Sequence, residues 1–262
     1  MTPPSPRTLL MEAVLSFNLP EESVRERLRQ IHEDVLAQSR HLRQPNFTAI
    51  HPRDLEFLFE AYDQRFLTGH ARRALEGRSL AFRLAPRLTR AGGKTTRFAI
   101  RAGEVSYEIA IAISMLFDAF GKNDRSISIC GVECPDRLQA LQRIFEHEFV
   151  HLLEQLCWHS SKCAAARFQD IAQRFFQHRT HTHELITRRE RAAHSGIRPG
   201  AMVSFICEGR RLTGRVNRIT KRVTVLVPDA EGRRYSDGGR YQTYYVPLAM
   251  LEPAVSQTEP QA

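Results

Sequence analysis

The sequence predicts an α+β protein in which a region of helices and a small sheet precedes a compact all-β region. Apolar residues recur at helical spacing between residues 21 and 66 and again between 136 and 176. Runs of β-type residues separated by glycines occupy residues 80–113, and a second series of short β runs fills residues 197–253. The chain of 262 residues, 42% of them hydrophobic, is long enough for one large domain or two ordinary ones.

Residues 1–44 are predicted to be an N-terminal arm followed by one amphipathic helix. Four prolines lie within the first 20 residues, which favours a loose arm. Pro20 with Glu21 and Glu22 suits the first turn of a helix, because proline loses no hydrogen bond there and acidic side chains interact well with the positive end of the helix dipole. We expect this helix over residues 21–42.

Residues 45–190 are predicted to form the main domain, which follows a break at Gln44-Pro45-Asn46. The expected elements are, in order, a helix from about residue 54, strands at 80–85, 95–100 and 107–113, a short strand or irregular crossing at 127–130, and helices at 136–157 and 164–176.

Residues 197–253 are predicted to form a small SH3-like or KOW-like β-barrel, because about five short strands with glycine turns occur in under 60 residues. Residues 254–262 are expected to be a disordered tail.

Composition excludes several classes of protein. No apolar stretch approaches the roughly 20 residues of a membrane-spanning helix, so we expect no membrane partner. The N-terminus lacks the pattern of a secretory signal, and five unevenly spaced cysteines argue against a disulfide framework and for a reducing compartment. We therefore expect a cytoplasmic protein.

The predicted helix at 136–157 contains His147-Glu148-Phe149-Val150-His151, an HExxH pattern. Residues four apart lie on one face of a helix, so both imidazoles can bind one metal ion. Zn²⁺ is the expected ion, because it accepts neutral imidazoles, keeps a position open for water and lowers the pKa of that water. Glu148 is the expected catalytic base, which predicts hydrolysis of peptide bonds. The apolar neighbours support a metal site, since burying these polar side chains is costly unless they are paired or ligated.

A catalytic zinc site needs a third protein ligand. The candidates that follow the motif are Cys157, His159, Cys163, His178, His181 and His183. Cys157 lies six residues after His151, a spacing that turns it largely away. Cys163 precedes the next helix, whose positive end would favour a thiolate, and His159 lies in the connecting turn.

Two further groups have simpler interpretations. His178, His181 and His183 could line the cleft or bind metal, but we favour a role as cationic side chains that cap the preceding helix. Cys130 and Cys134 could be half of a second metal site, but without a matching pair nearby we favour two ordinary buried thiols.

Three segments of the chain resemble the SprT-like zinc metalloprotease family, which includes the DNA–protein crosslink protease Spartan. They are 83–95 with its Ala-Gly-Gly-Lys-Thr end, 136–151, and 167–178. The resemblance covers about residues 50–187 and implies a zincin-like minimal metalloprotease fold, with a small antiparallel sheet, an active-site helix and a following helix. It implies that His147 and His151 bind zinc and that Glu148 is the catalytic residue.

In that family the third ligand is usually a His four residues before an aromatic residue at the start of the next helix. Counted back from Phe168, this position is Ala164, which cannot bind metal. Cys163, one residue earlier, is the preferred substitute, and His159 is the second choice. A thiolate donates more charge to zinc than an imidazole, so it would make the ion a weaker Lewis acid.

The predicted barrel holds more than half of the formal net charge of +9, with ten basic and five acidic residues. Tyr235, Tyr241, Tyr244 and Tyr245 are interleaved with these basic residues, as expected where cations meet phosphates and bases stack on rings. The alternative is ordinary strands with one face in the core and one in solvent. We favour nucleic-acid binding through phosphates, with little sequence preference.

Two functions from different classes fit these patterns. The first is a zinc metallopeptidase whose substrates are nucleic-acid-associated proteins. The second is a non-proteolytic zinc-containing factor that binds nucleic acid or belongs to the transcription or translation machinery. Glu148 favours the first, because a structural site needs no base, and the missing third His favours the second. We favour the metallopeptidase.

Overall fold

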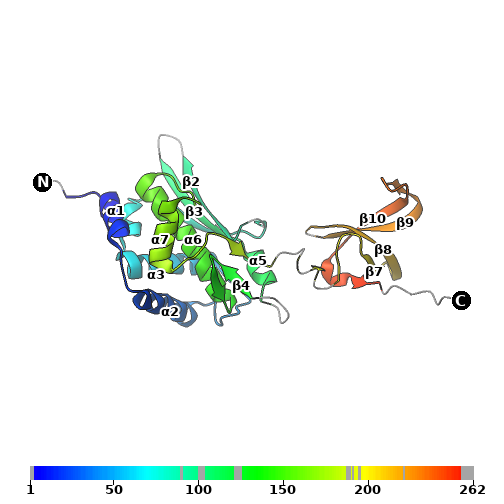
Figure 1. The fold of residues 1–262 in the computed structure, drawn as a ribbon, viewed down its shortest axis with the longest axis horizontal. Helices are drawn as coiled ribbons and strands as arrows, with labels where there is room; N and C mark the ends of the chain where they lie inside the picture. Colours follow the sequence, from blue (N-terminus) through cyan, green and yellow to red (C-terminus); the bar gives the residue numbers. More distant parts are fainter. Residues whose placement is uncertain are drawn as a thin grey trace. The chain divides into compact units, whose positions relative to one another are not determined.

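The structure is a computed structural model that describes residues 3–88, 91–99, 104–120, 126–186, 190, 192–193, 196–220 and 222–254. The chain is α+β, and it divides into two compact units, Met1–Leu185 and Ile186–Ala262 (Figure 1). The predicted tail at 254–262 lies outside the described residues except for Ala254. Among the described residues, no helix is both long enough and apolar enough to span a membrane.

The helices of unit 1 surround one long central helix, α6. They are α1 (Pro6–Ser16), α2 (Glu21–Gln38), α3 (Pro52–Leu67), α4 (His70–Ala74), α5 (Ile113–Asp118), α6 (Arg137–Trp158) and α7 (Ala166–Phe176). The helices predicted at 136–157 and 164–176 are confirmed as α6 and α7.

The N-terminal segment differs from the predicted loose arm. The Ser5 side chain accepts a hydrogen bond from the Thr8 amide at 3.1 Å, and proline occupies the first helical position, so the N-terminus of α1 is capped. Leu10 and Val14, one turn apart, are fully buried. Arg7 donates to the Cys157 carbonyl at 2.7 Å and so joins α1 to the end of α6. The prediction of a loose arm is therefore wrong for residues 6–16.

Helix α2 ends at Gln38, four residues before its predicted end. Ser39 has extended backbone, and its hydroxyl oxygen accepts hydrogen bonds from the amides of His41 and Leu42 while donating to Asp54. Leu42 is buried although it lies outside the helix, which explains why its apolar spacing extended the prediction.

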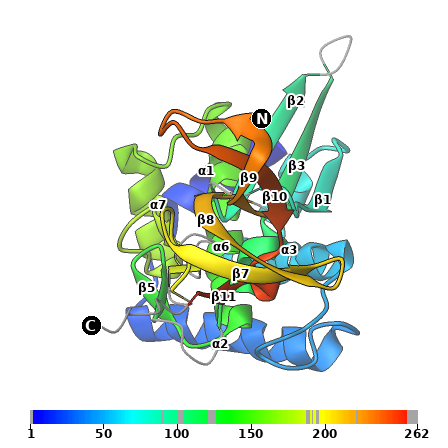
Figure 2. The same cartoon turned by 90° about the vertical axis from the view of Figure 1, so that its right-hand side faces the viewer.

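Two small sheets flank α6. The first contains β1 (Leu80–Leu84), β2 (Gly93–Ala99) and β3 (Val105–Ile111) in the order β1-β3-β2, with β2 on an edge (Figure 2). Because β1 pairs with β3 in parallel and β2 pairs with β3 antiparallel, this sheet is mixed and not the antiparallel sheet that was predicted. The second sheet is antiparallel and contains β4 (Ile127–Ile129), β5 (Val132–Cys134) and β6 (His183–Glu184) in the order β5-β4-β6.

The core of unit 1 is built on aromatic side chains. Tyr62 packs with ring centroids 5.8 Å from Phe145 and 5.5 Å from Phe176, and Phe149 lies 5.8 Å from Phe59. All five side chains are fully buried. Aromatic pairs of this kind stabilise a core by about 0.5–1.5 kcal/mol beyond their burial. Packing on several sides therefore fixes the position of α6.

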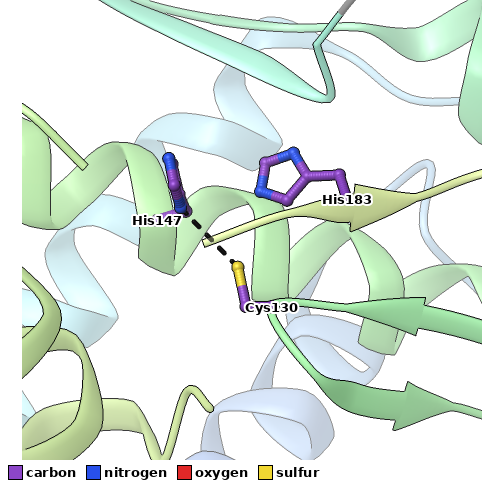
Figure 3. A group of neighbouring side chains, drawn as sticks. All are labelled: Cys130, His147 and His183. Carbon is purple, nitrogen blue, oxygen red and sulfur yellow. Dashed lines mark hydrogen bonds between the residues drawn. The ribbon is translucent and has the colours of Figure 1, made fainter. Parts of the chain in front are cut away.

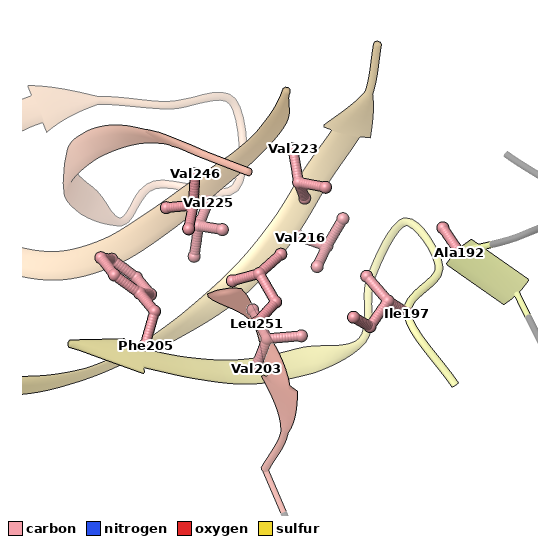
Figure 4. Close-up of a cluster of buried hydrophobic side chains, with 9 residues drawn as sticks. All are labelled: Ala192, Ile197, Val203, Phe205, Val216, Val223, Val225, Val246 and Leu251. Carbon is pink, nitrogen blue, oxygen red and sulfur yellow. The ribbon is translucent and has the colours of Figure 1, made fainter. Parts of the chain in front are cut away.

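Unit 2 is an antiparallel sheet in the order β10-β9-β8-β7-β11. Its strands are β7 (Met202–Cys207), β8 (Arg210–Ile219), β9 (Val223–Arg234), β10 (Arg240–Val246) and β11 (Glu252–Pro253), with a short 3-10 helix at Leu248–Met250. The sheet covers the core shown in Figure 4: Ala192, Ile197, Val203, Phe205, Val216, Val223, Val225, Val246 and Leu251. The five short strands are confirmed. The closed barrel is not, since β10 and β11 remain separate edges among the described residues.

Candidate metal centre

Helix α6 places His147 and His151 one turn apart on the same face. Their Nε2 atoms lie 3.2 Å apart, so both imidazoles are directed at one point. Two nitrogens bound to one tetrahedral zinc at about 2.0–2.1 Å each would be separated by about 3.3 Å. The two histidines that the motif predicts therefore have the spacing of a ligand pair.

Cys163 lies with these histidines. Its Sγ and one ring nitrogen from each of His147 and His151 lie within 4.8 Å of one another. The cysteine belongs to the turn before α7, where the Ala165 amide donates to the Lys162 carbonyl. His159, the second choice, is the exposed C-cap of α6 and belongs to neither group of neighbouring metal-binding side chains found among the described residues.

Glu148 is buried beside the first histidine and is held by strand β2. The Thr95 hydroxyl donates to the Glu148 carboxylate at 2.8 Å and lies 2.9 Å from the Glu148 carbonyl. Burial raises the pKa of Glu148 to about 7, against the opposing hydrogen bonds from Thr95. A group with this pKa can both accept and return a proton near neutral pH.

Strand β2 approaches this carboxylate closely because it begins with glycine. A Cβ on Gly93 would lie 2.7 Å from the Glu148 Cγ, and a Cβ on Gly92 would lie 2.5 Å from the His183 Nδ1. Sequence reasoning missed the roles of Gly93 and Thr95. The Ala-Gly-Gly-Lys-Thr segment contained the signal, since adjacent glycines allow a backbone to pack against a site.

The histidine, cysteine and glutamate side chains line one cavity of about 530 Å³. The lining residues are Ala91, Gly92, Gly93, Lys94, Thr95, Met115, His147, Glu148, His151, Gln155, Ser161, Cys163, His181, Thr182 and His183. Burial lowers the pKa of His147 to about 2 and that of His151 to about 4. Both rings are therefore neutral near pH 7 and offer a lone pair to a metal ion.

A chain of hydrogen bonds orients His151. Its Nδ1 lies 2.6 Å from the Ser161 oxygen, and the Ser161 hydroxyl donates to the Glu154 carboxylate at 2.6 Å. Because Ser161 uses its proton on Glu154, its oxygen accepts the Nδ1 proton of His151, which leaves the lone pair of the imidazole on Nε2. Arg167 donates to the fully buried Glu154 and stacks 4.4 Å from the Trp158 ring.

The other edge of His147 faces the second sheet. The Cys130 Sγ lies 3.6 Å from its Nδ1, and the His183 ring centroid lies 4.7 Å from its own (Figure 3). Cys130 and Cys134 are both buried, as predicted, but the closeness of Cys130 to the motif was not foreseen. All five cysteines lie in the described part of the chain and are free.

The predicted capping role of the later histidines is wrong. Helix α7 ends at Phe176, and its C-cap residue Gln177 lies in the left-handed region (φ 60°). Backbone amides donate to the Ala172 and Gln173 carbonyls, and Arg143 donates to the Phe176 carbonyl. His178 is fully buried instead, and its Nε2 lies 2.9 Å from the Glu146 carboxylate. His181 and His183 line the cavity. The sequence could not show that His181 and His183 line the cavity and do not cap α7, because the strand that contains His183, β6, is only two residues long.

The described basic residues of unit 2 lie at its surface, and two of them form ion pairs. Arg211 pairs with Glu252, and Arg215 pairs with Asp237. The others, all exposed, are Arg198, Arg210, Arg218, Arg222, Arg233, Arg234 and Arg240. The tyrosines differ from one another: Tyr245 is 61% exposed, whereas Tyr244 packs against the core residue Phe205.

Comparison of the chain with protein-family models, with curated proteins and with solved structures gave no match. The function must therefore be argued from the residues of the site and their geometry.

Proposed function

We propose that the chain is a zinc-dependent metallopeptidase of the SprT-like, zincin-like kind. One observation supports this most strongly. Two imidazoles and a thiol lie together beside a buried carboxylate, and all four groups line the same open cavity. A structural zinc site is usually closed by four ligands, whereas a catalytic site has three protein ligands and a free position. The donor set fits zinc, which binds both neutral imidazole and thiolate.

In this proposal His147, His151 and Cys163 hold the ion. Zinc bound there would polarise a peptide carbonyl and lower the pKa of water. Glu148 accepts the proton of the attacking water and returns it to the leaving amine. Thr95 holds the carboxylate in place for both steps. The thiolate of Cys163 donates more charge than a third imidazole and so reduces the Lewis acidity of the ion.

The substrate in this proposal is a protein associated with nucleic acid. Strand β2 is an edge strand and contributes Gly93, Lys94 and Thr95 to the cavity, so an extended peptide could pair with it. The exposed arginines of unit 2 would hold the enzyme near DNA or RNA through phosphates. The free cysteines agree with the proposed cytoplasmic location.

The second candidate is a non-proteolytic zinc-containing factor that binds nucleic acid or belongs to the transcription or translation machinery. The observation that favours it is Cys163, because thiolate ligands are common in structural zinc sites. Glu148 is the observation against it, because a structural site needs no buried carboxylate of raised pKa beside its ligands.

The test separates metal binding from proteolysis. Zinc content and casein cleavage, with and without single-stranded DNA, are measured for the unaltered protein and for Glu148→Gln. Glu56→Gln, which alters an exposed glutamate of α3, is the matched control. We expect Glu148→Gln to keep its zinc and to lose at least about 100-fold in cleavage rate. If zinc is bound but cleavage is absent from the unaltered protein, the second candidate replaces the first.

A further inference from the structure

We propose that Cys130, His147 and His183 form a second metal-binding site, for a thiophilic ion, on the opposite edge of the His147 ring. These three residues are called the inner set here, and His147, His151 and Cys163 the outer set. The inner set does not depend on proteolysis, and it would exist in either of the two candidate functions.

The geometry of the inner set is that of a ligand group. Its three donor atoms lie within 4.8 Å of one another, and the Cys130 Sγ is 3.6 Å from the His147 Nδ1. For a sulfur and a nitrogen bound to one tetrahedral zinc at about 2.3 Å and 2.0–2.1 Å, the expected separation is about 3.5 Å. Figure 3 shows the three side chains converging from the end of β4, from α6 and from β6.

His183 supplies an independent observation. Its Nε2 is buried and makes no hydrogen bond to any described residue. The ring points toward His147, with the two ring planes 75° apart (Figure 3). Buried polar atoms are nearly always partnered, and an exception requires an explanation such as an ion. A metal ion between His183 and Cys130 would provide that partner.

The backbone holds the inner set in a fixed frame. The Cys130 amide donates to the Thr182 carbonyl at 2.7 Å, and the Cys130 carbonyl accepts from the amides of Arg179 and Thr180 at 2.9 and 3.1 Å. Strand β4 pairs Ile129 with His183. Cys130 and His183 therefore come together through main-chain hydrogen bonds, and their approach needs no metal. A preorganised site of this kind binds with little loss of conformational entropy.

One thiolate and two imidazoles select Zn²⁺, Co²⁺, Cd²⁺ or Cu⁺ over hard cations such as Mg²⁺. When the ion binds, the Cys130 thiol gives its proton to solvent and the thiolate forms the new bond. A neutral imidazole offers one lone pair, so His147 can bind an ion of only one set at a time. The inner and outer sets would therefore compete for His147, and the inner set would divert the ion away from Glu148.

The test uses Co²⁺, because a cobalt–thiolate bond gives a charge-transfer absorbance that a cobalt–imidazole bond lacks. Cys163→Ala removes the thiolate of the outer set. We expect the full-length Cys163→Ala protein to bind one Co²⁺ with the thiolate absorbance retained. Adding Cys130→Ala should abolish that absorbance. Adding Cys134→Ala, which removes a buried cysteine from the neighbouring strand, should leave the absorbance unchanged.

A second substitution checks the third donor. Adding His183→Ala to Cys163→Ala should weaken Co²⁺ binding at least about 10-fold, with far-UV circular dichroism unchanged to show that the protein is folded. The proposal is overturned if Cys163→Ala shows no thiolate absorbance, which would leave Cys130 as a hydrogen-bond partner of His147. It is also overturned if the absorbance persists without Cys130. Neither readout uses proteolysis, so metal binding by the inner set can be confirmed even if the protein cleaves no substrate.

Discussion

The two units differ in where they place their charges. Among the described residues, every buried ionisable side chain belongs to unit 1, and the buried polar side chains of unit 2 are the hydroxyls Ser204 and Thr224. The buried acidic and histidine side chains of unit 1 are Asp54, Asp63, Glu146, His147, Glu148, Glu154 and His178, and the thiols Cys130, Cys134 and Cys157 and the phenols Tyr62 and Tyr107 are buried there as well. Burying a charged side chain is costly unless that side chain is paired. A buried charged side chain therefore indicates either an interaction partner or a functional role. Unit 1 therefore buries ionisable side chains, whereas the charged side chains of unit 2 lie at its surface.

The largest expected effect on stability follows from Glu146. Its carboxylate accepts hydrogen bonds from the Tyr62 hydroxyl at 2.7 Å and from Arg143 at 3.0 Å, and it also contacts His178. Glu146→Ala would leave the buried Tyr62 hydroxyl and His178 Nε2 without an acceptor and Arg143 without its ion-pair partner, which costs about 3–5 kcal/mol. Trp158, the one tryptophan of the chain, reports the unfolding of unit 1 by its fluorescence in urea.

The matched control for that variant is an exposed ion pair of unit 2. Arg211 and Glu252 are 61% and 69% exposed, so Arg211→Ala should change the stability of unit 2 by less than about 1 kcal/mol. Its unfolding is followed by far-UV circular dichroism. If Glu146→Ala and Arg211→Ala lowered the free energy of unfolding by the same amount, buried and exposed charges would not differ in their contribution to the stability of this protein.

The next effect concerns metal affinity. Ser161→Ala breaks the hydrogen-bonded connection between His151 and Glu154, and the loss of such an outer partner typically weakens metal binding about 10–100-fold. Zinc affinity is measured by competition with a chelator. Ser160→Ala, on the exposed neighbouring residue, should leave the affinity unchanged. Equal affinities for both variants would mean that Ser161 does not position the ligand.

A smaller effect is expected from changing the environment of Glu148, the proposed catalytic base. Thr95→Val removes the hydroxyl that donates to Glu148 while keeping the shape of the side chain. A hydrogen bond to a charged group is worth about 1.5–3 kcal/mol, so kcat should fall at least about 10-fold. KM and zinc content should stay the same, because Thr95 belongs to neither set of donors. A change in zinc content without a change in kcat would contradict this assignment.

How far the sequence could predict this molecule depends on the kind of signal. Helix α6 and its two histidines followed from apolar periodicity and a four-residue spacing, which are properties of a single element. Cys130 and His183 could not be predicted as neighbours of His147, because they meet it only through the pairing of β4 with a two-residue strand. The mixed sheet was missed for the same reason, since the pairing of β1 with β3 joins segments separated along the chain.

The smallest expected effect concerns nucleic-acid binding by the exposed arginines of unit 2. Arg233 and Arg234 are exposed on β9 and form no ion pair within the described part of the chain, whereas Arg211 pairs with Glu252. If unit 2 binds nucleic acid through phosphates, Arg233→Ala and Arg234→Ala should each weaken binding a few-fold. Each should also reduce the slope of log affinity against log salt by about 0.7 for single strands, whatever the base sequence. Arg211→Ala should have less effect, because its charge is already neutralised locally. Fluorescence anisotropy with labelled oligonucleotides at several salt concentrations measures both quantities, and unchanged slopes would mean that the positive charge of unit 2 serves another partner.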